Sequence, residues 1–208
     1  MVNRFIRAGA LACALAAAPA SAADFSFVGT LGAPSDVLFF DFSVGASSPV
    51  TLRTYSYAGG INAAGTVIAR GGFDPILSLY DVSTGNRIGQ NDDGGCANVP
   101  ADAVTRACYD TFFQSLLDPG NYRVAVTVYP NFAPGPLGGS FPGANSFVDF
   151  TGNQRNGSFA FDVLNVASAT GPGGGVPEPA TWALMILGFG AIGGALRRRT
   201  SMTVRYAR

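Results

Sequence analysis

Hydrophobic and polar residues alternate with a period of two along most of the chain between residues 24 and 165. The alternation is clearest in Val37–Val44 and Tyr122–Tyr129, where every second residue is a large hydrophobic one. Because successive side chains of a β-strand point to opposite faces of its sheet, this period predicts half-buried strands. The expected strands are Asp24–Val28, Val37–Val44, Val50–Tyr57, Thr66–Ala69, Pro75–Tyr80, Arg87–Gln90, Tyr109–Leu116, Tyr122–Tyr129, Ser146–Phe150 and Ser158–Asn165.

Turn-forming residues separate these stretches. Asn91–Gly95 is acidic and glycine-rich, and Asp118-Pro119-Gly120-Asn121 has the composition of a tight turn. The proline- and glycine-rich residues Pro130–Asn145 predict a long surface loop. Many short strands without helical periodicity before Ala180 predict an all-β fold, an antiparallel β-sandwich of jelly-roll type.

The N-terminus has the three parts of a secretory signal peptide. Arg4 and Arg7 are followed by the apolar Ala8–Ala18 and by the small residues Ala20-Ser21-Ala22. Residues 1–23 are therefore expected to direct the chain to the Sec export machinery and to be removed by signal peptidase. The remainder, once the C-terminal part is also set aside, is a single cargo domain of residues 24–169.

The C-terminus contains one strongly apolar stretch. Residues 170–176 form a Gly/Pro linker, and Ala180–Leu196 carries 17 uncharged residues, which span about 25 Å as a helix. Trp182 lies near the start of this stretch at one expected membrane boundary, and Arg197, Arg198 and Arg199 follow it at the other. Because cationic residues stay on the cytoplasmic side, a short transmembrane helix is expected, with residues 200–208 as a cytoplasmic tail.

The same region carries Pro177-Glu178-Pro179 directly before the helix and the arginine cluster after it. Residues 177–199 thereby resemble the PEP-CTERM sorting signal of exported Gram-negative proteins. The resemblance implies recognition by an exosortase, a membrane-embedded cysteine protease, while the chain spans the membrane transiently. It also implies an inner-membrane intermediate, then the cell surface or extracellular matrix, with exopolysaccharide as a candidate partner. An ordinary C-terminal membrane anchor is the alternative interpretation.

Charge and missing residue types exclude several functions. Between Asp24 and Val176 there are 12 Asp, no Glu and six Arg, so this part carries 6 − 12 = −6. A domain of that sign does not hold nucleic acid by electrostatics. The chain also lacks His and Lys, which excludes Ser-His-Asp and Cys-His hydrolases and Schiff-base chemistry. We therefore expect a protein that is not an enzyme.

Cys96 and Cys108 are the two cysteines of the cargo domain. In an oxidising compartment two cysteines this close in a polar loop are expected to form a disulfide. Closing a loop of that size stabilises a fold by about 3 kcal/mol in the chain-entropy model.

Acidic and amide side chains gather at the predicted loop 91–95. Asn91, Asp92 and Asp93 offer oxygen ligands of the kind that calcium prefers, and Asp74 and Asp81 are additional candidates. The same residue types also cap turns by hydrogen-bonding to the backbone. Calcium is thus the one candidate cofactor, and turn capping is the competing interpretation.

Four short motifs follow one another in the middle of the chain: Asp74–Asp81, Gly85, Asn91-Asp92-Asp93 and Leu117–Val124. In this order and spacing, residues 73–128 resemble the bacterial pre-peptidase C-terminal domain, a small jelly-roll β-sandwich. The segment Cys96–Cys108 departs from that pattern as an insertion.

Three functions are compatible with these features. The first is an exported, non-enzymatic β-sandwich with an adhesion or matrix role. The second is a calcium- or carbohydrate-dependent binding module, for which Tyr55, Tyr57, Phe132 and Phe141 are candidate sugar-stacking residues. The third is a small secreted hydrolase, which would need two suitably spaced carboxylates with one raised pKa, and no pair among the 12 Asp stands out in the sequence.

Overall fold

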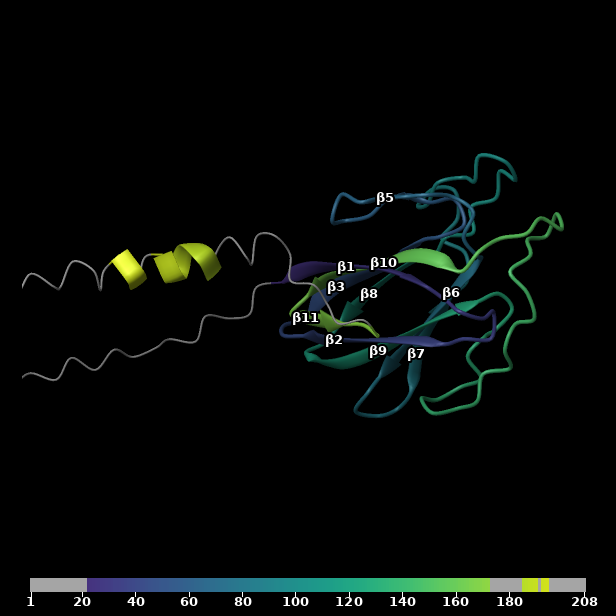
Figure 1. Cartoon of the computed structure of the whole chain (residues 1–208). Coiled ribbons are helices and arrows are strands. Elements are labelled where there is room, and N and C mark those ends of the chain that lie inside the picture. Colours follow the sequence, from purple (N-terminus) through teal and green to yellow (C-terminus); the bar gives the residue numbers. More distant parts are fainter. Residues whose placement is uncertain (1–21, 173–184, 191, 195–208) are drawn as a thin grey trace, which may run out of the picture.

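The computed structural model describes residues 22–172, 185–190 and 192–194. Residues 22–172 fold almost entirely into strands and loops, whereas 185–190 and 192–194 are helical (Figure 1). The strands are β1 (Ala23–Thr30), β2 (Leu38–Val44), β3 (Ser48–Tyr55), β4 (Gly60–Ile61), β5 (Val67–Ile68), β6 (Pro75–Asp81), β7 (Arg87–Asn91), β8 (Phe112–Leu117), β9 (Gly120–Val128), β10 (Ser158–Val166) and β11 (Ser168–Thr170).

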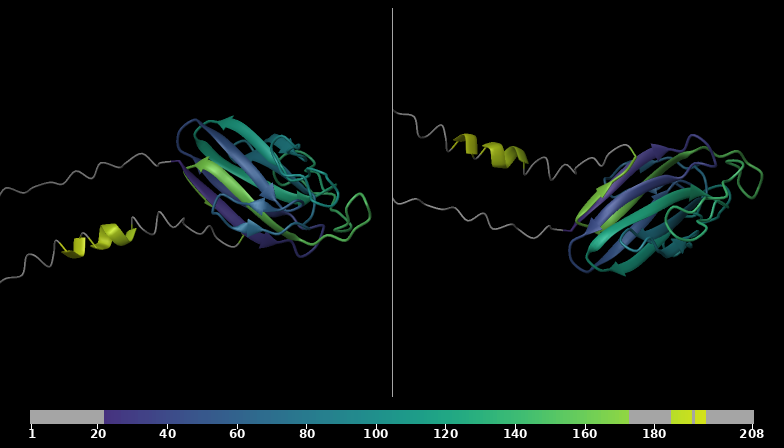
Figure 2. Two further views of the ribbon diagram at one scale, coloured as in Figure 1. Left: turned by 90° about the horizontal axis from the view of Figure 1, so that it is seen from above. Right: turned by 90° about the horizontal axis from the view of Figure 1, so that it is seen from below.

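Nine of these strands form two sheets that pack face to face. One sheet has the order β1-β10-β3-β8 and the other β11-β2-β9-β6-β7, while β4 and β5 make a separate two-stranded ribbon. Every strand pair in the described sheets is antiparallel. The two layers are seen in Figure 1 and, from above and below, in Figure 2. The predicted antiparallel β-sandwich is confirmed, and its jelly-roll type stays a prediction.

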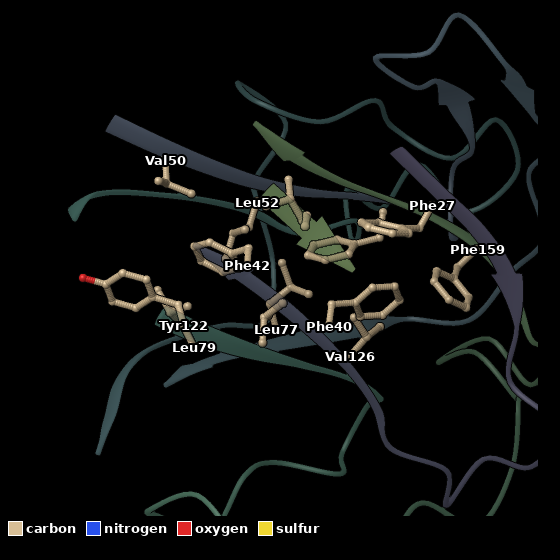
Figure 3. Close-up of a cluster of buried hydrophobic side chains, with 14 of the residues drawn as sticks. Phe27, Phe40, Phe42, Val50, Leu52, Leu77, Leu79, Tyr122, Val126 and Phe159 are labelled. Carbon is tan, nitrogen blue, oxygen red and sulfur yellow. The ribbon is translucent and has the colours of Figure 1, made fainter. Parts of the chain in front are cut away.

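The core lies between the two sheets and is rich in phenylalanine. Phe40 of β2 packs 5.0 Å from Phe27 of β1 and 4.9 Å from Phe161 of β10, measured between ring centroids, so these contacts join both layers (Figure 3). Leu52, Leu77 and Val126 extend this core and are almost wholly buried. Each such side chain contributes about 1.5–3 kcal/mol by its burial. The alternation predicted for β2 and β9 therefore corresponds to an inward-facing hydrophobic set.

The predicted surface loop 130–145 has a structural role that its composition did not indicate. Its Ala133 packs with Tyr80 and Ala125, residues on the outer face of the second sheet, and Leu137 and Phe141 add to this second cluster. The loop therefore covers part of that face, which explains why residues of β6 and β9 are buried on both sides.

Most predicted strands occur within a few residues of their expected bounds, but two of the predictions need correction. Ser146–Phe150 is not a strand, because the segment makes only an isolated bridge, between Val148 and Gln154. The Asp149 carboxylate accepts hydrogen bonds from the backbone N–H groups of Thr151 and Asn153, and these bonds stabilise a turn instead. Thr170, expected to begin the linker, belongs to β11, which pairs with β2.

The strand directions give the sandwich two different ends. β6, β8 and β10 begin at one end, where β3, β7 and β9 finish. β1 and β11 begin at the other end. In Figure 1 the starts of β1 and β11 lie on the left, whereas the loop connecting β9 to β10 lies on the right.

Several predicted segments lie outside the described residues. These are most of the signal peptide, the linker after residue 172, the Pro-Glu-Pro motif, Trp182, the three arginines of 197–199 and the tail 200–208. The described part of Ala180–Leu196 is helical. Within the described residues no helix has both the length and the apolar character needed to cross a membrane.

Candidate functional site

A cleft of about 360 Å³ opens at the end of the sandwich where β6, β8 and β10 begin. Its walls come from the residues that precede or follow the strands at this end and from the loop residues 146–150. The lining includes four carboxylates, one arginine and several aromatic rings: Asp74, Asp92, Asp93, Asp149, Arg155, Tyr57, Phe73, Tyr109, Tyr129, Phe147 and Phe150.

Three of these carboxylates meet because of how two strands pair. Asp74 directly precedes β6, and Asp92 and Asp93 directly follow β7. β6 and β7 are antiparallel, with Leu77 opposite Asn91, so the start of one lies beside the end of the other. One carboxylate oxygen from each of Asp74, Asp92 and Asp93 lies within 4.8 Å of the others. The pairing thus collects three negative charges at one corner of the cleft.

The surroundings at this corner disfavour the ionised forms of Asp74 and Asp92. Burial, followed by the charges of Asp92 and Asp93, raises the pKa of Asp74 to about 8. Burial and then the charge of Asp93 raise the pKa of Asp92 to about 6. Oδ1 of Asp74 and Oδ1 of Asp92 are buried and accept no hydrogen bond from the described part of the chain. A proton or a bound cation would therefore stabilise this group.

Two of the predicted ligands have other roles. Asn91 is the last residue of β7; its Oδ1 accepts a hydrogen bond from the Phe112 backbone N–H at 3.2 Å, and its Nδ2 donates to the Asp93 carbonyl. Asp81 lies at the opposite end of β6 from Asp74, and its Oδ1 accepts hydrogen bonds from the hydroxyl and backbone N–H of Ser83. The Ser83 hydroxyl is also the main cause of the lowered pKa of Asp81. The turn-capping interpretation describes both residues.

Arg155 is the cationic residue in the lining of the cleft. It is only 6% exposed, and its guanidinium stacks 3.8 Å from the centroid of the Tyr57 ring. Its Nε donates to Asp149 at 2.9 Å, and its Nη1 donates to the Tyr57 carbonyl at 3.1 Å. Burial alone would raise the pKa of Asp149, but hydrogen bonds from Thr151, Asn153 and Arg155 lower it to about 2. A buried arginine is thus held beside an ionised partner, while its Nη2 has no hydrogen-bond partner among residues 22–172.

Of the four aromatic residues predicted to stack on sugars, Tyr57 lines the cleft and the other three do not. Tyr55 is buried beneath Arg53, Phe132 packs on Tyr129, and Phe141 packs on Phe39. The four candidates therefore do not share one face.

The rings of Tyr109, Phe147 and Phe150 line the cleft although the sequence did not predict a binding role for them. Tyr109 lies 5.0 Å from Tyr57 and 5.7 Å from Phe150 between ring centroids, and Phe150 is 64% exposed. Phe150 follows Asp149 in the segment that was wrongly predicted as a strand, so no local pattern marked it.

The predicted disulfide between Cys96 and Cys108 is confirmed, with their Cα atoms 5.1 Å apart. The loop that it closes contains the buried Asp102, which accepts two hydrogen bonds from Arg70. Tyr109 directly follows Cys108, so the disulfide fixes one wall of the cleft.

The described residues thus define an antiparallel β-sandwich with an acidic, aromatic-lined cleft at one end. C-terminal to it, residues 175–199 match the family described as the PEP-CTERM protein-sorting motif. That motif is the substrate signal for exosortase-type processing, and it marks an exported, membrane-processed protein. No curated protein matches the chain. The predicted sorting signal is confirmed, and the resemblance of residues 73–128 to the pre-peptidase C-terminal domain stays a prediction.

Proposed function

We propose that this protein is exported by the Sec pathway, processed by an exosortase-type protease, and placed at the cell surface or in the extracellular matrix. There its sandwich has a non-enzymatic role in adhesion or matrix building. The observation that carries this proposal is the match of residues 175–199 to the PEP-CTERM protein-sorting motif. The disulfide, which is typical of exported proteins, supports the same destination.

The test replaces the central residue of the motif. Glu178, the chain's one glutamate, is changed to Ala, and a tagged chain is followed by cell fractionation and by its size on gels. We expect the variant to stay in the inner membrane as a larger precursor. Asp118→Ala removes the same charge from an exposed turn of the sandwich and should be sorted normally. If Glu178→Ala is sorted and sized like the unchanged chain, the ordinary membrane anchor is the better interpretation.

A second candidate, a calcium-dependent binding module, is favoured by one observation. One buried oxygen each of Asp74 and Asp92 accepts no hydrogen bond from residues 22–172, and these two carboxylates and that of Asp93 each have an oxygen within 4.8 Å of the others. Calcium takes six to eight oxygen ligands, and carboxylates are its usual protein donors. Three such groups carry more than enough negative charge to balance that of calcium, and they leave further coordination positions for other ligands.

Calorimetric titration of the purified full-length chain with calcium, after treatment with chelator, tests this second candidate. We expect saturable binding that Asp92→Asn weakens and that Asp118→Asn leaves unchanged. Absence of a calcium-dependent heat would refute it.

A further inference from the structure

We propose that the cleft binds a neutral, polyhydroxylated ligand, a short segment of a saccharide chain. This inference deepens the extracellular role proposed above and rests on it. Three features of the cleft lining carry it: buried acceptors, a buried donor, and an exposed aromatic ring.

The acceptors are the orphaned carboxylate oxygens. Oδ1 of Asp74 and Oδ1 of Asp92 are removed from solvent, and neither accepts a hydrogen bond within the described structure. A buried polar atom without a partner costs free energy, so a ligand that donates hydrogen bonds here gains affinity. Hydroxyl and ammonium groups can both donate.

The buried donor, Arg155, narrows the choice of ligand. Nε and Nη1 of Arg155 are occupied by Asp149 and the Tyr57 carbonyl, whereas Nη2 has no partner in the part of the chain that the structure describes. Arg155 is 94% buried, taking its 6% exposure, and it lines the same cleft as Asp74 and Asp92. The ligand must therefore accept as well as donate. An ammonium group cannot accept, whereas a hydroxyl does both.

Charge argues against an anionic ligand. Four carboxylates and one arginine line the cleft, and residues 24–176 carry a net charge of 6 − 12 = −6. A phosphate or a polyuronate would be repelled by both. A neutral saccharide carries closely spaced hydroxyl groups and is not repelled by these charges.

The rim of the cleft offers an apolar surface beside these polar groups. Phe150 is 64% exposed, and its ring meets Tyr109 edge-to-face at 5.7 Å. The C–H face of a pyranose ring can pack on such a ring while its hydroxyls reach the walls. The volume of about 360 Å³ lies at the small end of ligand sites, which suits one or two sugar rings.

The test measures binding of the purified full-length chain to an array of neutral oligosaccharides, with alginate oligosaccharides as the anionic comparison. We expect at least one neutral saccharide to bind and alginate not to bind. Phe150→Ala should raise the Kd about tenfold, since it removes the stacking surface. Phe39→Ala, which removes an aromatic ring on the outer face of the second sheet, should leave the Kd unchanged. Each variant is checked for an unchanged circular dichroism spectrum.

The outcomes separate this inference from the function on which it rests. If no neutral saccharide binds, or if Phe150→Ala binds as the unchanged chain does, the inference is overturned. Normal sorting that still depends on Glu178 would leave the exported role intact in that case. Saccharide binding that is equal in calcium and in chelator would support the inference and count against the calcium-dependent module.

Discussion

Replacing Asp74 by Asn tests the electrostatics of the acidic corner directly. The substitution keeps the size of the side chain but removes its charge from within 4.8 Å of Asp92 and Asp93. Two unit charges at that separation repel each other by about 3 kcal/mol at an effective dielectric constant of about 20. Losing this repulsion outweighs the desolvation of the new amide, so the variant should gain about 3 kcal/mol at pH values where Asp74 is otherwise ionised.

The pH dependence follows from the direction of the pKa shift. The pKa of Asp74 is about 8 in the folded protein and 3.8 for the free side chain, so the folded state holds the proton more tightly. Below about pH 4 the group is protonated in both states and costs nothing. As the pH rises from 4 to 8, the unfolded state loses the proton first and the free energy of unfolding falls. The free energy of unfolding of the unchanged protein should therefore fall between pH 4 and pH 8, and that of Asp74→Asn should fall less.

Urea denaturation followed by circular dichroism, in chelator at pH 4, 6 and 8, measures this difference. We expect equal stability at pH 4 and a gap of about 3 kcal/mol at pH 8, or a rise in Tm of about 6–12 °C. Calcium at a hundredfold excess over its Kd should close most of this gap, because it adds about 2.7 kcal/mol to the protein that binds it. Equal stability at pH 8 in chelator, or a gap that does not change with pH, would refute the reasoning.

Four further variants test the sandwich. Replacing Cys96 and Cys108 together by Ser should lower the free energy of unfolding by about 3 kcal/mol, measured as urea stability against the oxidised protein. Phe40→Ala removes the ring that joins both sheets and should cost about 3–5 kcal/mol by the same assay, and a loss below 1 kcal/mol would contradict the core assignment. Gly72→Ala should prevent folding, because its Cβ would collide with backbone and side-chain oxygens, whereas Gly65→Ala meets no atom within 4 Å and should cost about 1 kcal/mol through its positive φ. Soluble yield and thermal melting compare the two glycine variants.

The period-two alternation predicted much of the fold because burial on one side of a sheet imposes that pattern. It located the strands β2, β9 and β10 well, since each places a run of large side chains in the core. It missed β4 and β11, which are only two and three residues long and carry too few positions to show a period. It failed at Ser146–Phe150, where the hydrogen bonds of one aspartate decide the local conformation.

The cleft was predicted only in part, because it depends on pairing between distant residues. The sequence marked Asp92 and Asp93 by their loop composition but did not separate Asp74 from Asp81. The seven-residue strand β6 begins directly after Asp74 and ends at Asp81, about 23 Å away, so only one of the two aspartates can border the cleft. Arg155 had no local signal at all, because its role comes from contacts with Tyr57, almost a hundred residues away.

The two ends of the sandwich differ in what they offer to the surroundings. β1 begins at the end opposite the cleft, and β11 ends at Thr170, which pairs with Asp41 in the middle of β2. None of residues 22–30 or 168–172 lines the cleft, so these two segments leave its opening free. Copies displayed side by side on one surface would turn their clefts toward the medium together. A long polymer could then contact many copies at once, and such multivalent contact can strengthen weak single-site binding by about 10²–10⁴. A modest affinity in each cleft would be enough to hold a matrix polymer against a cell, and the polymer would stay exchangeable at every individual site.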